Sequence, residues 1–484
     1  MRVCATPLLA ALALGACTIA PDRIASVDPV PQSWPAGDSY LAQAEAGLPA
    51  VSYRDIFIDP RLRTLIEQAL VDNRDLAVAA ANIAAARAQV RVVRSAQFPE
   101  IGVDGSVTRR QSGSTSSGTG ESTSSGSRTQ FSLQGGISAF ELDLFGRLVN
   151  ATAAERQRAL STEAAARTVR LALVADLAGA WASYAADRDL LAIARDTATS
   201  ARRSVQLTRA RLQGGVAPRT DLRQAEQVLD TAEGDLALRT TALAQDENLI
   251  RLLIGGTVDP SLLPDNLDEA IRAVATLPAG TSSEVLLRRP DVVEAEYLLR
   301  AASADIAVAR AELFPRISLN GLLGLASTAL SSLVSSDGFA ATGGVGAGYT
   351  IFDAGGRRAN VAVTRAQRDA ALGRYEKAIQ TAFREVADAL ATQGRIAERV
   401  RAAVANTAAS ADVARLTEAR YRGGVDSFLA SLDAQRSLFQ ARQQETAVRL
   451  ALVQNRIDLY RALGGDQATS VKADPQAPAR RGLF

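Results

Sequence analysis

The 484-residue chain contains one pattern twice, and this internal duplication limits its possible folds more than any other feature. Corresponding residues recur at an almost constant offset of 209 to 216 positions: Phe98 and Phe314, Asp143 and Asp353, Gly214 and Gly423, Gly255 and Gly464. The offset changes mainly between the first two pairs, where the first copy is longer. A nearly uniform shift over so much of the chain indicates duplication of a whole structural unit.

Each copy predicts a hairpin of strands inserted between helices. Phe-Pro follows an Ala-rich helical run, two alternating segments come next, and Gly-Arg leads back into helix. From Gly344 to Ile351 the alternation is strict, so one face is apolar and the other is small or polar. We therefore expect hairpins at about 99–143 and 315–353. Residues that cannot continue a helix or that restart one mark the helix–strand junctions: Pro99, Gly146, Pro315 and Gly356.

The predicted strands are long enough to cross a bilayer, for which a tilted strand needs roughly ten residues. Four strands do not close a barrel, and an open sheet would leave unpaired backbone groups in lipid. The pattern therefore predicts that several copies of the chain share one barrel. Residues 111–127, between the first two strands, are almost entirely Ser, Gly and Thr, which is typical of a flexible outer loop.

The remainder of each copy predicts a hairpin of unusually long helices, at 147–254 and 357–463. Both carry the apolar seam of a coiled coil, as in Val174, Leu177, Trp181 and Tyr184 of the first. The helices turn at glycine pairs: Gly214 with Gly215, and Gly423 with Gly424. At 1.5 Å per residue, the first long helix, from Arg147 to about Leu212, would be about 100 Å long.

These boundaries divide the chain into a first repeat at 59–258 and a second repeat at 284–465, joined by a proline-containing link at 259–283. Residues 17–58 carry five prolines and predict an extended segment, and residues 466–484 predict a disordered tail. No later apolar run is as long as the roughly 18 residues of a transmembrane helix.

Residues 1–16 predict a signal peptide with a short apolar core, and its end resembles a bacterial lipobox. Leu14-Gly15-Ala16 stands directly before Cys17, which in this resemblance becomes the lipidated first residue of the mature protein, with S-diacylglycerol and N-acyl groups. Thr18, rather than Asp, then indicates the outer membrane. The alternative is an ordinary secretory signal with an incidental cysteine. Removal of Cys4 with the signal would leave no possible disulfide.

Composition excludes several functions. The chain has no histidine, so histidine-based metal sites and Ser-His-Asp triads are absent. A net charge of +2 gives no reason to expect nucleic acid as a partner. No phosphate-binding loop, nucleophile elbow or cysteine pair is present, so we expect neither an enzyme nor a cofactor other than the lipid on Cys17.

The combination resembles the outer membrane factors, which are the TolC-like exit ducts, and within them the NodT/OprM-type lipoproteins of RND efflux systems. Besides the lipobox and the duplicated hairpins, the segments that carry this resemblance are 288–291, 420–426, 432–436 and 459–465. It implies an α+β membrane protein, a homotrimer whose twelve-stranded β-barrel takes four strands from each chain and continues into a long α-helical periplasmic barrel. It also implies an outer membrane location, a periplasmic adaptor, an inner-membrane RND pump and expulsion of drugs or small toxic compounds.

The resemblance places a periplasmic gate on the second helix hairpin, at Tyr421, Leu429, Asp433 and Arg436. Asp433 and Arg436 are neighbours on one helical face, so around a threefold axis they could form a ring of pairs. The glycine pairs at the two helix turns would face the adaptor. The alternative is that Asp433 and Arg436 form an ordinary solvated pair and that the glycines only make turns. The first-copy counterparts of the pair, Gln224 and Gln227, are uncharged.

Three other functions remain open. A duct for type I protein secretion would have the same architecture. A metal-efflux duct is also compatible, although one methionine and no histidine provide no relay of soft ligands. A periplasmic coiled-coil lipoprotein would explain the helices but not the paired hairpins.

Overall fold

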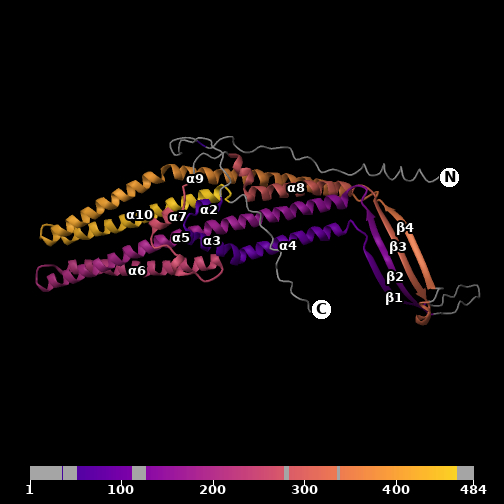
Figure 1. Cartoon of the computed structure of the whole chain (residues 1–484), viewed down its shortest axis with the longest axis horizontal. Coiled ribbons are helices and arrows are strands. Elements are labelled where there is room, and N and C mark those ends of the chain that lie inside the picture. The colour runs from indigo at the N-terminus through magenta and orange to yellow at the C-terminus, as the bar shows by residue number, and fades with distance from the viewer. Residues whose placement is uncertain (1–34, 36–51, 112–126, 277–282, 335–337, 466–484) are drawn as a thin grey trace, which may run out of the picture. The chain divides into compact units, whose positions relative to one another are not determined.

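The computed structural model describes residue 35 and residues 52–111, 127–276, 283–334 and 338–465 (Figure 1). They fall into two compact units. The sheet unit contains Ala84–Thr162 and Ala295–Tyr375, and the helical unit contains the described parts of Asp28–Ile83, Glu163–Glu294 and Glu376–Phe484. The predicted signal peptide, Cys17, most of the first hairpin loop and the predicted tail lie outside the described residues.

The sheet unit contains four antiparallel strands in the order β1-β2-β3-β4 (Figure 1). Their bounds are Ile101–Gln111, Ser127–Leu142, Arg316–Ser327 and Phe339–Gly348. Each strand has at least ten residues, the length that a tilted strand needs to cross a bilayer. The two predicted hairpins are thus present, and β2 pairs with β3 to join them into one sheet.

Strand register gathers the apolar side chains on one face. Val103 pairs with Gly135, Gly135 with Leu323, and Leu323 with Ala341, so these residues lie side by side across all four strands. By the same alternation Asp104, Ser106, Gln134 and Asn320 lie on the opposite face. The apolar side chains have little cover within the chain, since Val103 is 74% and Leu323 60% exposed. A sheet with one bare apolar face and one polar face requires an apolar environment on one side only.

A β-bulge in β2 keeps this division intact. Ile137 pairs with Gly321 and Phe140 with Leu319, so β2 has one more residue than β3 between these pairs. The extra residue returns Phe140 and the following Leu142 to the apolar face. Just before the bulge, Gly136 has φ +146°, and a Cβ there would lie 2.2 Å from the carbonyl oxygen of Gly321. The position therefore requires glycine.

One expectation about β4 is wrong. The alternating pattern extends to Ile351, whereas the strand ends at Gly348. Gly348 pairs with Arg316, so the next rung would bring Tyr349 opposite Pro315, which has no N–H to donate. Beyond it, Ala354 and Gly355 adopt φ +53° and +88° in the turn that leads into the next helix.

Four long helices form two hairpins (Figure 1). The first consists of α5 (Arg147–Gln213) and α6 (Arg219–Ile254), and the second of α9 (Gly356–Arg422) and α10 (Phe428–Ala462). Helices α5 and α9 each contain 67 residues, about 100 Å at 1.5 Å per residue. The predicted seam is buried, with Leu177 and Trp181 inaccessible in the first hairpin and Ile379 and Val386 inaccessible in the second.

Shorter helices pack around the bases of these hairpins in the helical unit: α2 (Tyr53–Ile56), α3 (Pro60–Asp72), η2 (Pro260–Leu262), α7 (Leu267–Ala273) and η3 (Ser283–Arg288). The sequence did not predict η2 and α7, which lie in the proline-containing link. Asn266 starts α7 by accepting a hydrogen bond from the Glu269 N–H at 3.0 Å. The Trp181 indole donates to the Leu262 carbonyl at 3.0 Å, which fixes the link against α5.

Buried Arg289 explains why the sequence Arg-Arg-Pro-Asp opens α8 (Pro290–Ala311). Its guanidinium donates to the carbonyl of Ala462 at 2.7 Å, at the last turn of α10. Asp291 and Glu385 hold the same group at 2.7 and 2.8 Å. The buried charge is therefore paired on two sides, and it satisfies a helix C-terminus that would otherwise lack a partner.

By length and hydropathy, α4 (Arg74–Ser95) is the one described helix that could cross a membrane, although Asn82 and Arg87 interrupt its apolar residues. Its 18-residue window has a mean hydropathy of 1.3, largely because the helix is rich in alanine. Alanine counts as apolar on such a scale but equally suits close helix packing, so length and composition alone do not make α4 a membrane helix.

Candidate functional site

The two helix turns share one backbone conformation. After α5, the Gly214 N–H donates to the Ala210 carbonyl and the Val216 N–H to the Arg211 carbonyl, at 3.0 and 2.9 Å; α9 ends with the same two bonds 209 residues later. Gly215 and Gly424 have φ +71° and +74°, which is the left-handed conformation of a helix C-terminus. The sequence prediction of these turns is confirmed, and the copies differ mainly in their side chains.

A salt bridge closes the second turn alone. Asp426 receives two hydrogen bonds from the Arg420 guanidinium, at 2.6 and 3.2 Å. This contact raises the pKa of Arg420 and lowers the pKa of Asp426. In the first turn Ala217 occupies the position of Asp426, so the counterpart of Arg420, which is Arg211, has no such carboxylate.

Arg211 instead lies over the ring of Tyr421, with its guanidinium carbon 4.8 Å from the ring centroid. This cation–π contact joins the end of α5 to the end of α9. Tyr421 is 8% exposed and lies 5.3 Å from Phe428, centroid to centroid. Its hydroxyl oxygen is buried and has no hydrogen-bond partner among the described residues.

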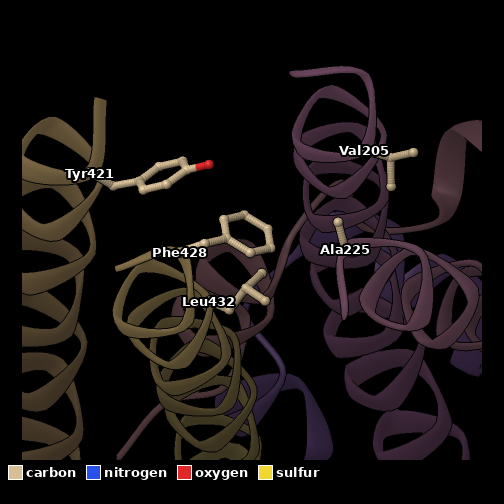
Figure 2. Packing of buried hydrophobic residues seen from close by; sticks show 5 residues of the cluster. All are labelled: Val205, Ala225, Tyr421, Phe428 and Leu432. Carbon is tan, nitrogen blue, oxygen red and sulfur yellow. The ribbon is translucent and has the colours of Figure 1, made fainter. Parts of the chain in front are cut away.

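An apolar cluster joins the two hairpins beside this contact. We call it the tip cluster; its buried members are Val205, Ala225, Tyr421, Phe428 and Leu432. Figure 2 shows Tyr421, Phe428 and Leu432 on the second hairpin, with the Tyr421 ring directed toward the first. Leu222, Val228 and Leu229 of α6 pack against the same cluster. The contact is therefore apolar at its centre and has one cation at its edge.

The four residues predicted as a gate separate into two sets. Tyr421 is buried in the tip cluster, whereas Leu429, Asp433 and Arg436 lie on an exposed stripe of α10 at spacings of four and three. Leu429 is 50% exposed. Asp433 and Arg436 form an ion pair of 3.6 Å with both side chains about half exposed. The described part of the chain thus leaves about half of each of these side chains exposed.

The predicted junction residues lie where helix and strand meet. Pro99 stands two residues before β1, and Pro315 directly precedes β3. Gly146, with φ +77°, directly precedes α5. Gly356 is the first residue of α9, and the residues with left-handed backbone at this junction are the two before it, Ala354 and Gly355. The side chains of Asp143 and Asp353 accept hydrogen bonds from the first-turn N–H groups of these helices.

Sequence reasoning missed Arg211, Asp426 and the α5–α6 side of the tip cluster. A signal for the first two was available, because alignment of the two copies sets Ala217 against Asp426 while keeping both arginines. No sequence signal places Arg211 next to Tyr421. Among the described residues, no group of three or more acidic, cysteine or histidine side chains could hold a metal ion.

Comparison with known proteins identifies the class. The model of the outer membrane efflux protein family matches residues 65–256 and 281–465, so the chain belongs to this family. It is similar to the antibiotic efflux pump outer membrane protein ArpC of Pseudomonas putida, with 39% identity over 464 residues and 94% of each chain covered.

Two further similarities extend the comparison. The cation efflux system protein CusC of Escherichia coli is 35% identical over 464 residues, covering 95% of this chain and 98% of CusC. A crystal structure of a membrane protein from Pseudomonas aeruginosa has a TM-score of 0.82 and 32% identity, covering 93% of this chain and 100% of that one.

The chain is therefore an outer membrane efflux channel with a TolC-like fold. It contributes four strands to a twelve-stranded barrel shared by three subunits, and its helices extend into the periplasm. A closed barrel satisfies every strand edge. The apolar face of the sheet then meets lipid, and the polar face that carries Asp104 and Gln134 lines the lumen.

Proposed function

We propose that this channel is the passive exit duct for small toxic organic compounds, supplied by an inner-membrane RND pump through a periplasmic adaptor. The observation that carries the proposal is the sheet with one apolar and one polar face, since it provides a water-filled path across the outer membrane. Similarity to ArpC over nearly the full length supports the substrate class and the pump-driven assembly.

We further propose that the helix turns form the periplasmic entrance, with the second hairpin constricting it. Three copies of Leu429 would narrow the opening, and Asp433 with Arg436 would pair between subunits as well as within them. An exposed ion pair is worth about 0–1 kcal/mol, so three such contacts make a closure that a docking partner can open. The exposure of this stripe in the single chain supports an intersubunit role.

The tip cluster would hold each second hairpin in the closed position. Opening the entrance requires α9 and α10 to move relative to α5 and α6, which strains the contact of Tyr421 with Arg211. A partly desolvated cation–π contact is worth about 0.5–2 kcal/mol. The glycine turns at 214–215 and 423–424 would meet the adaptor, whose binding would supply the energy for this movement.

We also propose that Cys17 carries the N-acyl and S-diacylglycerol groups predicted from the sequence, which would anchor the extended N-terminal segment in the outer membrane. Radiolabelled palmitate should appear in the wild-type protein and be absent from the Cys17→Ala variant.

The gate is tested by replacing both members of the exposed pair, in Asp433→Ala/Arg436→Ala. We expect a larger single-channel conductance in planar bilayers and greater antibiotic entry into cells, because a set of closing contacts is lost at the threefold axis. The matched control is Asp412→Ala/Arg415→Ala, which removes an ion pair of the same spacing, 2.6 Å long, from α9. Equal conductance in all three proteins would remove Asp433 and Arg436 from the gate.

A second candidate function is cation efflux, favoured by the similarity to CusC. The two substrates are distinguished by expressing the gene in a strain that lacks its own outer membrane efflux channels but retains the pumps. Restored resistance to organic compounds alone supports the main proposal, and restored resistance to metal cations alone supports the alternative.

A further inference from the structure

Two arginines lie directly opposite each other on the polar face of the sheet. In the register of β1 and β2, Arg110 pairs with Arg128. The same face carries Thr108, Gln130 and Ser132, as the alternation along each strand requires. Since the opposite face is the apolar one, both guanidinium groups belong to the lumen side of the barrel.

Chain connectivity places this pair at the extracellular mouth. Strand β1 follows α4, and β2 leads into α5. The helices therefore attach to these strands at the ends that lie far from Arg110 and Arg128. The helices extend into the periplasm. Both arginines are within two residues of the hairpin loop and therefore lie at the outer end of the lumen.

No carboxylate in the described part of the chain forms an ion pair with either arginine. The nearest acidic residue on the same face of β1 is Asp104, six positions away, which is about 20 Å along a strand. Like charges directly opposite each other in an antiparallel pair destabilise the pairing. The sheet thus keeps an unfavourable pair that nothing within the described residues neutralises.

The second copy shows that strand pairing does not require these charges. The offset between the copies is 216 at the start of the hairpin and 210 at its end, so the counterpart of Arg110 is Ala326 in β3 and the counterpart of Arg128 is Gly338, just before β4. They occupy the same place at the outer end of the second hairpin, and a Cβ added to Gly338 would lie 3.1 Å from the Ala326 carbonyl oxygen. One hairpin of each subunit is thus small and neutral where the other carries two positive charges.

We propose that Arg110 and Arg128 of the three subunits form a ring of six guanidinium groups that binds anions at the extracellular mouth of the channel. The ligands would be organic molecules that carry carboxylate, sulfonate or phosphate groups, because guanidinium recognises these planar or multidentate anions. A cluster of one sign in a water-filled passage raises the local concentration of the opposite charge. The ring would accordingly favour the final release step for anionic solutes over cationic ones.

The test measures block of single-channel current by inositol hexakisphosphate added to one side of a planar bilayer at a time. We expect block from the extracellular side in the wild type. In Arg110→Gln/Arg128→Gln the half-blocking concentration should rise roughly tenfold or more, since the attraction that concentrates the anion is removed. Raising the salt concentration should weaken wild-type block. The Debye length is near 10 Å at 0.1 M and becomes shorter as salt is added, so the arginine charges attract the anion over a smaller distance.

Two variants separate charge from fold. Arg110→Lys/Arg128→Lys keeps the charge and should retain block. Arg109→Gln removes one positive charge at the same end of β1 but on the opposite face, and it should leave block unchanged. Equal block in the wild type and the double glutamine variant, loss of block in Arg109→Gln, or block only from the periplasmic side would each overturn the proposal. Insertion of each variant into the bilayer as a conducting trimer shows that the duct itself is intact.

Discussion

In the first helix turn Arg211 extends to the ring of Tyr421 on the other hairpin, whereas in the second turn its counterpart Arg420 is held within its own turn by Asp426. The backbones of the two turns are closely alike, and two exchanges between them, Ala217 against Asp426 and Leu212 against Tyr421, accompany the difference. Duplication thus supplied two equivalent hairpins, and side-chain divergence made one self-contained and the other a support for its neighbour.

The largest expected effect comes from Tyr421→Ala, which removes the ring that both the tip cluster and Arg211 contact. Loss of a buried aromatic side chain costs about 3–5 kcal/mol, so amides at the α9–α10 turn should exchange with solvent at least a hundredfold faster. Hydrogen exchange of the detergent-solubilised trimer measures this. Leu212→Ala, at the equivalent position of α5, is the control and should have a smaller effect; the reverse order would refute the role of Tyr421.

The next largest effect is a dependence of stability on pH, caused by a pair of carboxylates, Asp187 and Asp246, that only the first hairpin has. Burial and the negative charge of Asp187 raise the pKa of Asp246 to about 7, and Arg239 pairs with Asp187 at 3.4 Å. The second hairpin has Ile396 and Asn455 at these positions. The folded protein binds this proton more tightly than the unfolded chain does, so stability falls as pH rises from about 4 through about 7.

Asp246→Asn gives the first hairpin the residue of the second and should remove this pH dependence. At pH 8 the variant should be more stable than the wild type by about 1–2 kcal/mol, after allowance for solvent screening of a partly exposed group. Thermal unfolding between pH 5 and 8 measures the effect. A parallel pH dependence in both proteins would show that another group is responsible.

A smaller effect is expected from Ala217→Asp, which copies the salt bridge of the second turn into the first. The new carboxylate should draw Arg211 away from Tyr421 and weaken the contact between hairpins by about 0.5–1 kcal/mol. A double-mutant cycle with Arg211→Gln, read by hydrogen exchange at the tips, isolates this coupling. If Ala217→Asp weakens the contact equally when Arg211 is absent, the salt bridge does not act through Arg211.

The smallest expected difference, which is zero between the two turns, tests what they share. Gly215→Ala and Gly424→Ala each place a Cβ in open space but in a left-handed conformation. Each should destabilise its own turn by about 1 kcal/mol, and by the same amount, because the backbone geometry is equal. Exchange rates at the two turns provide the comparison. A clear inequality would indicate that side chains, and not only the backbone, determine the cost.

The repeated features were predictable because each rests on many residues. Two hairpins, two long helix pairs and their glycine turns followed from periodicity and offset alone. Details that depend on a single partner residue on a neighbouring strand could not be predicted. The end of β4 is set by Pro315 on the neighbouring strand, and the bulge after Ile137 is visible only once β2 is paired with β3. The alternating pattern of one strand does not show where the neighbouring strand ceases to offer N–H groups for pairing.

The candidate site was predictable in part. Resemblance indicated Tyr421, Leu429, Asp433 and Arg436, but it did not separate the buried tyrosine from the exposed stripe. That separation depends on which face of α10 meets the first hairpin, and the spacing of Phe428 and Leu432 alone does not identify their partner. Arg211 lies 210 residues from Tyr421 in sequence, so only the packing of the hairpins brings them together.

The equal length of α5 and α9 constrains how such a duct can evolve. The tip cluster requires both hairpin ends to lie level with each other. Seven residues added to one copy alone would displace its tip by about 10 Å and uncover the cluster. The reach of the tunnel can therefore change only when matched heptads are gained or lost in both halves of the gene, and descendants with longer or shorter ducts should carry the change in pairs.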